Sequence, residues 1–409
     1  MIFSQLHQQS RPEQREMSIN SEEFYDYVTA GSAHVSVNSA MALSAVYACV
    51  YVLSSSLAQL PLHVLRKTDN KIEKGADHAA FEILSNSPNF WQTSYDWRES
   101  TQSQVLGWGN GYTEILRNRR GEITGLEMHQ SALTTLEKRS SNRYLYATQD
   151  EDGKALAISP EDMIHIKALG SKGKLGESPI RQHAKTLGLG LSALDYGNKF
   201  FASGGQPTGI ASAKSVANSD AWERLKTVWK QIKTAMKEPD SGAILLPADI
   251  DYKQLVVPPE EAQFLETRKF NRSEIAGIYN VPAHMINDLE KATFSNISEQ
   301  AIQFVRHSIM PWVVKWEQEL NRKLFTSFER KAGYYVKFNL AGLLRGTPKE
   351  RAEFYHFGIT DGWMNRNEAR IFEDMNPVNG LDEFLISVNQ SQKNETNPTT
   401  NQNQGENND

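Results

Sequence analysis

The stretch NISEQAIQFVRHSIMPWVVKWEQELNRKLF, residues 296–325, shows the pattern around which the rest of the fold is organised. Its apolar residues recur every three or four positions, which is the spacing of one face of a helix. They are Ile302, Val305, Ile309, Trp312, Trp316, Leu320 and Leu324. The pattern predicts a helix from Ile297 to Phe325, about 40 Å long at about 1.5 Å per residue. Pro311 lies mid-helix and has no N–H to donate to the carbonyl of His307, so we expect a kink there.

A polar break, LEKATFSNISEQ, precedes this helix at Leu289–Gln300. Thr, Ser and Asn side chains compete with helix formation by bonding to nearby backbone groups, so they favour caps and turns. Upstream we expect another helix, from about Ala262 to Tyr279, which ends at NVPAHM because Pro282 disfavours helical geometry in the residue before it. The first half of that helix, FLETRKFNRSE, is polar nearly all round. Such a helix is expected to bridge lobes or to pack beside other chains.

The N-terminal half predicts an α+β lobe with an antiparallel sheet. Residues 40–59 are apolar on almost every face, which predicts a fully buried helix. The strand LPLHVLRK follows, and later YTEILRN and EITGLEMH flank the turn RRG as a hairpin. NRYLYAT and MIHIKAL are further strands, and YYVKFNL returns to a sheet after the long helix. A helical pair is expected after Thr347, with Gly362 in its turn and Asn365 capping the second helix.

A helix from about Arg181 to Ser203 ends at GGQPTG, and a compact insert follows. The insert should contain the strand GIASA, one helix, and a pair of strands in GAILLPADIDYKQLVV. Beside the apolar stripe of the insert helix runs a row of lysines, formed by Lys226, Lys230, Lys233 and Lys237. Two interpretations of this lysine row stay open: a docking face for an acidic partner or a phosphate backbone, and an ordinary solvated helix face.

Composition limits the classes of protein to consider. The chain has 409 residues, of which 39% are hydrophobic and 23% charged, so it can bury a core in two or more lobes. Its formal net charge of -5 argues against tight binding of nucleic acid, which needs clustered Lys and Arg, but is compatible with weak contact with DNA. No stretch reaches the roughly 18 apolar residues of a membrane span, and the N-terminus lacks the apolar region of a signal peptide. We expect a soluble, unsecreted protein with no membrane partner.

The chain contains a single cysteine, Cys49. Cys49 lies in the apolar run SAVYACVYVL, where a thiol behaves as a small buried hydrophobe, and no intramolecular disulfide is possible. A reducing compartment fits this best.

Residues 1–38 are polar and patternless, which predicts a mobile arm. Residues 389–409 are rich in Asn and Gln with nothing apolar, which predicts a disordered tail.

Motifs of enzymes are weak or missing in the sequence. GWGNG lacks the GxGxxG spacing and is interpreted as a turn, and GSKGKLGES lacks the glycine and the Ser or Thr of a phosphate-binding loop. The ten histidines form no HExxH pair, and no GxSxG nucleophile elbow occurs. The expectation is a protein that is not an enzyme, with no catalytic residues, no metal and no cofactor.

The polar helix, the break and the long helix together show a family resemblance. The run FLETRKFNRSEIAGIYNVPAHMINDLEKATFSNISEQAIQFVRHSIMPWVVKWEQELNRKLF, with FNLAGLLRGTPKERAEFYHFGITDGWMNRNEAR after it, closely resembles the portal proteins of tailed bacteriophages of the HK97-like family. GESPI, YGNKFFASGGQPTGI and GNGYTEI resemble earlier motifs of that family. The likeness covers roughly residues 40–388 and is most specific from Phe264 to Arg345.

The resemblance implies a ring of twelve subunits at one capsid vertex, assembled in the host cytoplasm and then part of the virion. Double-stranded DNA would pass through the ring during packaging and ejection, bound weakly and without sequence specificity. The implied partners are the terminase large subunit, the head-tail adaptor, the major capsid protein and the scaffold. The implied fold is α+β, with a wing carrying an antiparallel sheet, long stem helices, a small α/β clip, a kinked tunnel helix and a helical crown.

Each implied part corresponds to a segment of the chain. The divisions are a mobile arm at 1–38, the first part of the wing at 39–180, a stem helix at 181–203, the clip at 204–258, a second stem helix at 259–286, the tunnel loop at 287–298, the kinked tunnel helix and returning wing strand at 299–344, the crown at 345–388 and the tail at 389–409. The lysine row then lies on the clip, where terminase and adaptor proteins dock. Pro311 lies in the helix behind the tunnel loop.

In this interpretation the polar break is the tunnel loop, which projects into the bore. A channel must pass DNA without holding it, because every phosphate neutralised around a ring adds affinity through counterion release. Thr293, Ser295 and Asn296 offer weak neutral contacts, and Lys291 gives one positive charge per subunit. Phe294 would pack against the neighbouring loop. A mobile connection between two helices would explain the same residues in one chain alone, and the family context favours the loop.

Two other classes of function stay open on the sequence alone. One is a phage-associated DNA-processing enzyme such as a nuclease, for which metal-dependent cleavage abolished by one carboxylate substitution would be the evidence. The other is a DNA-binding regulator, against which the acidic net charge argues.

Overall fold

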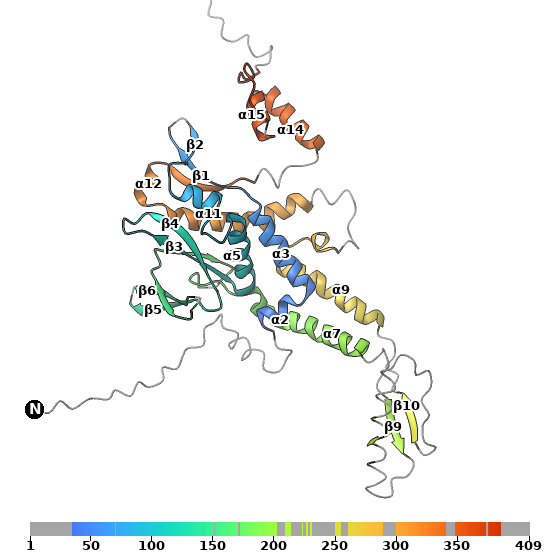
Figure 1. The fold of residues 1–409 in the computed structure, drawn as a ribbon. Coiled ribbons are helices and arrows are strands. Elements are labelled where there is room, and N and C mark those ends of the chain that lie inside the picture. Colours follow the sequence, from blue (N-terminus) through green and yellow to red (C-terminus); the bar gives the residue numbers. More distant parts are fainter. Residues whose placement is uncertain are drawn as a thin grey trace, which may run out of the picture. The chain divides into compact units, whose positions relative to one another are not determined.

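The computed structural model describes most of the chain. The described residues are 35–69, 71–141, 143–150, 152–170, 172–202, 209–213, 223, 226–227, 230, 250–254, 261–288, 300–340, 348–373 and 375–385. They belong to two compact units, one up to Asn339 and the other from Leu340 onward, whose helices and strands are drawn in Figure 1.

The first unit combines helices with short antiparallel sheets, which confirms the predicted α+β class. Its helices are α2 (Val37–Met41), α3 (Ser44–Ala58), α4 (Ala80–Ser85), α5 (Ser94–Trp108), α6 (Pro179–Gln182), α7 (Ala184–Ala202), α9 (Glu261–Ile278), the 3-10 helix η1 (Ala283–Ile286), the π-helix η2 (Phe304–Ile309), α11 (Met310–Leu324) and α12 (Ser327–Lys331). The helices predicted for residues 181–203 and 262–279 are therefore present as α7 and α9.

In the described ranges every strand pairing is antiparallel. The strands are β1 (Leu62–Lys67), β2 (Ile72–Lys74), β3 (Asn110–Arg117), β4 (Ile123–His129), β5 (Thr135–Ser140), β6 (Arg143–Gln149), β7 (Ala155–Ile158), β8 (Met163–Lys167), β9 (Gly209–Ala213), β10 (Ile250–Gln254) and β11 (Tyr334–Phe338). They form sheets in the orders β11-β1-β2, β4-β3-β8, β5-β6-β7 and β10-β9. The predicted hairpin is β3 with β4, and the returning strand β11 pairs with β1, with Val336 opposite Val64.

The N-terminal helix differs from the fully buried one predicted for residues 40–59. The chain forms two helices there, and Ser36 caps the first in a capping box with Ser39. Tyr47 and Tyr51, one turn apart on α3, are 57% and 55% exposed, and their rings stack with 6.3 Å between centroids. The prediction was wrong because it counted tyrosine as apolar, although the hydroxyl suits a side of the helix that faces water.

Two tryptophans join α11 to α5 in the core. Trp97 and Trp316 are both fully buried, and their rings meet edge to face with 5.3 Å between centroids. The Trp97 indole N–H donates to Thr113 Oγ1 at 3.0 Å, and the Trp316 indole N–H donates to Gln102 Oε1 at 2.9 Å. Both rings are therefore buried without an unpaired donor. Leu320, one turn further along the predicted apolar face, is buried as well.

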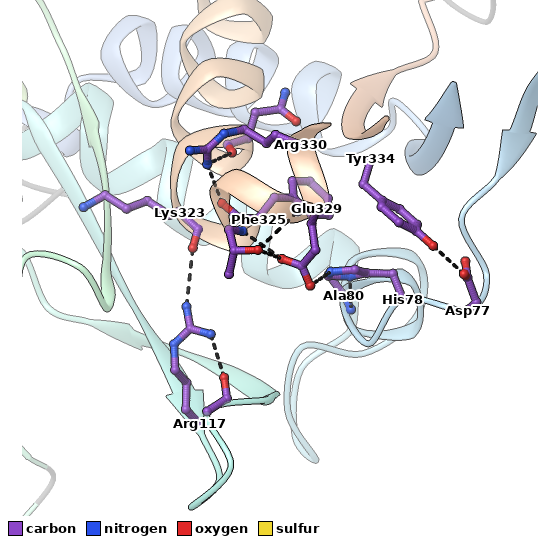
Figure 2. Close-up of polar contacts among 12 residues, drawn as sticks. Asp77, His78, Ala80, Arg117, Lys323, Phe325, Glu329, Arg330 and Tyr334 are labelled. Atoms are coloured by element: carbon purple, nitrogen blue, oxygen red, sulfur yellow. Dashed lines mark hydrogen bonds and ion pairs between the residues drawn. The ribbon is translucent and has the colours of Figure 1, made fainter. Parts of the chain in front are cut away.

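Polar contacts fix the C-terminal end of α11, as Figure 2 shows. Thr326 and Glu329 form a capping box at the start of α12, and Glu329 Oε1 also lies 3.2 Å from His78 Nε2. Arg117 of β3 donates to the carbonyl of Lys323 at 3.4 Å. Since His78 lies just before α4 and Arg117 lies on β3, the segment formed by the end of α11 and by α12 contacts two separate parts of the unit.

Asn110 links two glycine-rich segments that the sequence treats as separate turns. Its Nδ2 donates to the Gly176 carbonyl at 2.9 Å, and its Oδ1 accepts from the Gly176 N–H at 2.8 Å. Since this fixes the amide orientation, Oδ1 also accepts from His165 Nε2 at 2.9 Å, and His165 Nδ1 accepts from the Tyr146 hydroxyl at 3.0 Å. Burial, followed by the positive charge of Lys167, holds the pKa of His165 well below its usual value, so the ring is neutral.

The glycines of these two segments are explained by their contact. Gly109 ends α5 with a φ of +84°, which agrees with the predicted turn at GWGNG. A Cβ at Gly176 would lie 2.0 Å from the Gly109 carbonyl oxygen, so a side chain there has no room. The segments around Gly109 and Gly176 are thus glycine-rich because their backbones pack together.

The predicted burial of Cys49 is confirmed. The side chain is fully buried on α3, and burial raises the pKa of its thiol to about 12. The thiol is therefore protonated at neutral pH and unreactive while α3 stays packed.

The second unit contains the predicted helical pair, α14 (Pro348–Thr360) and α15 (Arg366–Phe372). Asn365 caps α15 in a capping box with Glu368, and Gly362 has a φ of +76° in the turn, as predicted for both positions. Thr347, after which the pair was predicted to begin, lies outside the described residues. Across both units, the described helices include none with the length and apolar character needed to cross a membrane.

Candidate functional site

The structure describes the flanks of the predicted tunnel loop. The residues predicted to face DNA lie outside the described ranges, and these are Lys291, Thr293, Phe294, Ser295 and Asn296. The described chain stops at Asp288 and resumes at Gln300. We call residues 276–288 and 300–311 the loop base, because these two parts contact each other and carry the ends of the predicted loop.

The first part of the loop base turns the chain sharply after α9. Asn280 has a φ of +53°, a left-handed geometry that asparagine adopts more readily than most other side chains. The N–H of Val281 bonds to the carbonyl of Ala276 at 2.9 Å and closes the helix end. Pro282 then precedes η1, and Asn287, with a φ of +61°, ends it. The helix α9 therefore ends where NVPAHM predicts.

The second part of the loop base contains a widened helical turn. Residues Phe304–Ile309 form η2, in which hydrogen bonds reach the fifth residue back, as the Met310 N–H does to the Val305 carbonyl. Pro311 lies in the first turn of α11, where a missing N–H is tolerated. The rod predicted as one helix thus changes its hydrogen-bond pattern just before Pro311. The size of any kink at that residue stays a prediction.

Two hydrogen bonds join the two parts of the loop base. Asn280 Nδ2 donates to the carbonyl of His307 at 2.9 Å. In a regular α-helix that carbonyl would accept from the N–H of residue 311, which is proline here. In return, Ser308 Oγ donates to the Asn280 carbonyl at 2.5 Å. We call these two bonds the asparagine clamp.

A cavity of about 380 Å³ lies between the two parts of the loop base. Polar residues that line it are Asn280, His284, Asp288, Gln300, Gln303, His307 and Ser308. Amide, hydroxyl and imidazole groups dominate this lining, and its residues include neither lysine nor arginine. The surface can therefore form hydrogen bonds but presents no cluster of positive charge to a phosphate.

The predicted lysine row is described only in part. Lys226 and Lys230 are each helical and exposed, whereas Lys233 and Lys237 lie outside the described residues. Lys226 Nζ forms an ion pair with Glu223 at 2.9 Å, one turn away. Such surface pairs contribute only about 0–1 kcal/mol to stability, but the carboxylate offsets part of the charge that a docking face would present. Both interpretations of the row remain compatible with these contacts.

In the part of the chain that the structure describes, no group of three or more His, Cys, Asp or Glu side chains is placed to hold a metal ion.

Sequence reasoning missed the clamp, although it had found the carbonyl that needs a partner. The sequence predicted a kink at Pro311 and showed that the carbonyl of His307 lacks its usual donor, but gave no other donor for it. A signal was available in the asparagine of NVPAHM, since asparagine is enriched at left-handed helix ends and its amide can donate. The side chain that donates lies 27 residues before its acceptor.

Comparison with known proteins gives the family. The model of the family described as phage portal protein matches residues 44–374, which include the whole loop base. The chain is 29% identical over 373 residues to the portal protein of Enterobacteria phage HK97, covering 88% of this chain and 85% of that protein.

Solved structures share the fold at lower identity. The crystal structure of an HK97 family phage portal protein from Corynebacterium diphtheriae has a TM-score of 0.58 and 18% identity, over 78% of this chain and 99% of that chain. A chain in the neck of a native gene transfer agent particle, computed with C12 symmetry, has a TM-score of 0.53 and 19% identity, over 87% of this chain and all of that one. With the family model covering most of its length, the chain belongs to the phage portal proteins of the HK97 family, which are structural and not catalytic proteins of the virion.

Proposed function

We propose that copies of the chain form a ring at one vertex of the capsid, through which double-stranded DNA is packaged and later ejected. The family match over residues 44–374 is the observation that carries this proposal. The shared fold with a neck protein from a particle computed with C12 symmetry supports a ring of twelve subunits. The ring docks the terminase large subunit and then a head-tail adaptor, and it contacts the major capsid protein and the scaffold during assembly.

The parts of the ring follow the segments of the chain. We assign residues 39–180 and β11 to the wing, α7 and α9 to the stem, residues 204–258 to the clip, 287–298 to the tunnel loop, η2 and α11 to the tunnel helix, and 345–388 to the crown.

The packing of α9 supports side-by-side contact between stems of neighbouring copies. Its buried side includes Asn271 and Ile275, and α7 comes so close that a Cβ at Gly190 would lie 2.7 Å from the Asn271 side chain. The residues at 272–274 are exposed and polar. At residues 271–275, then, α9 has a buried side and an exposed polar side, which suits a wall that meets other subunits and water.

The lining of the cavity in the loop base, which is mostly neutral and includes neither lysine nor arginine, supports passage of DNA without strong retention. Neutral groups do not release condensed counterions from DNA, so they add little affinity however many subunits repeat them. Lys291 would supply one positive charge per subunit, enough to centre a duplex in the bore.

Electron microscopy tests the ring directly. Negative-stain images of the purified full chain should show annular assemblies, and light scattering should give the mass of many subunits. A protein that stays monomeric over a range of salt, pH and protein concentration would contradict the proposal.

Replacing Lys291 with glutamate is expected to reduce the DNA packaged per particle by about tenfold or more, since each subunit then turns a negative charge toward the phosphates. The replacement Lys291→Gln should give a smaller loss, because it removes the attraction without adding repulsion. Thermal unfolding of both variants should match that of the original chain. Normal packaging by Lys291→Glu would mean that this residue does not face DNA.

Replacing Lys226, Lys230, Lys233 and Lys237 together with glutamine is expected to leave ring assembly intact and to weaken terminase binding by about tenfold. Binding to the purified ring, measured at two salt concentrations, provides the test. Glu223→Gln is the matched control: it removes the carboxylate that pairs with Lys226, so it should leave terminase binding equal or stronger. Unchanged binding by the quadruple variant would support the solvated-face interpretation of the row.

A further inference from the structure

Pro311 at the start of α11 removes the backbone donor that would serve a carbonyl of the preceding turn in a regular α-helix. Pro311 has no N–H, so the carbonyl of His307 has no partner at the fourth residue ahead. Asn280 Nδ2 supplies that hydrogen bond at 2.9 Å. The side chain of one part of the loop base thus takes the place of a backbone amide in the other part.

The clamp also sets which residues of the two parts lie opposite each other. Ser308 is 5% exposed, and its hydroxyl donates to the carbonyl of the same Asn280. Two bonds from consecutive residues, 307 and 308, to one asparagine fix the register as well as the separation of the two parts. They close a segment of 27 residues that contains the whole stretch from 289 to 299. Closing a segment of that length costs backbone entropy, so the contacts at its base decide where its ends lie.

Asparagine is suited to this position in two respects. Its backbone has a φ of +53°, which glycine would accept and most side chains would not. Its amide donates, which glycine cannot do and aspartate can do only when protonated. Substitutions at Asn280 can therefore remove its side-chain bond to the His307 carbonyl while they keep the backbone turn and the carbonyl that accepts from Ser308.

We propose that Asn280 is the positioning residue of the tunnel loop: by donating to the carbonyl that Pro311 cannot serve, it holds the end of α9 and the widened turn η2 in one register. The register fixes where both ends of the loop begin. This inference rests on the proposed role of residues 287–298 as the tunnel loop, but its first test does not depend on that role.

Hydrogen exchange of the assembled full chain provides the first test. In Asn280→Gly, the amides of residues 304–310 should exchange about fivefold faster, as expected when one hydrogen bond is lost. In Asn280→Asp the increase should be at least as large, because the carboxylate turns an acceptor toward the His307 carbonyl. The control is Asn89→Gly, which removes another asparagine that donates to a backbone carbonyl, that of Leu126 at 3.0 Å, and should leave these amides unchanged.

A double variant separates positioning from general stability. In Pro311→Ala the restored N–H at position 311 can serve the His307 carbonyl within the helix. Asn280→Gly should then accelerate exchange by less than about twofold when it is added to Pro311→Ala. The inference fails if the amides of residues 304–310 exchange at the same rate in Asn280→Gly as in the original chain. It also fails if Asn280→Gly accelerates their exchange equally in the presence and in the absence of Pro311.

Packaging provides a second, separate test. The DNA packaged per particle should fall at least about twofold in Asn280→Gly, which is the low end of the effects seen when a residue that couples two elements is replaced. It should recover in the double variant. If exchange responds as expected and packaging does not, the clamp holds the loop base but the proposed DNA role of the loop is wrong. If exchange does not respond, Asn280 does not hold the two parts of the loop base together, whatever the packaging measurement shows.

Discussion

Trp316→Ala is expected to destabilise the first unit by about 3–5 kcal/mol, the usual cost of removing a buried aromatic side chain. The ring is fully buried against Trp97, so its removal leaves a large cavity between α11 and α5. It also removes the donor that bonds to Gln102 Oε1 and leaves a buried acceptor without its partner. Urea unfolding followed by circular dichroism measures the change, since this signal does not depend on the tryptophan itself.

Trp312→Ala is the matched control for this prediction. Trp312 lies one turn earlier on the same helix but is only half-buried, and its ring lies under the Lys315 amine at 4.8 Å. Its loss should cost only about 1 kcal/mol. Similar costs for the two variants would show that the Trp97 contact does not anchor α11 in the core.

Asn110→Leu should cost about 3–6 kcal/mol, because it leaves buried groups of Gly176 and His165 without their partners. The side chain is fully buried, so water cannot take over these bonds. The same unfolding measurement applies, and we expect the loop around Gly176 to become sensitive to proteolysis before the rest of the unit unfolds.

The control for Asn110 is an asparagine with as many hydrogen bonds in an exposed turn. Asn118 Nδ2 donates to Glu122, and its Oδ1 accepts from the N–H groups of Arg120 and Glu122. Asn118→Leu should cost only about 1 kcal/mol, since water replaces the lost partners. Equal costs at the two positions would show that burial is not what makes Asn110 important.

The long elements were predictable because their signals are local. The spacing of apolar residues identified α11, and the turn RRG between two alternating runs identified β3 and β4. Caps followed rules of only a few residues, as with Asn365. The strands β2 and β5 were missed because their residues are mostly exposed, so no alternation of buried and exposed positions marks them.

The contacts that build the site were not predictable in the same way. Asn110 and Gly176 are 66 residues apart, and the two partners of the clamp are 27 apart. Pattern analysis reveals that a group needs a partner, as it did for His307, but not which distant side chain provides it. The tertiary arrangement supplies that information, and for single residues such as Asn280 the sequence offers only a conformational preference.

The buried thiol on α3 has a practical consequence for work on the assembled particle. A maleimide or other thiol-reactive dye can attach to this chain at one atom only, and it reaches that atom only when the helix around Cys49 opens. The rate of labelling would therefore report how often α3 opens in the assembled particle, with no engineered cysteine.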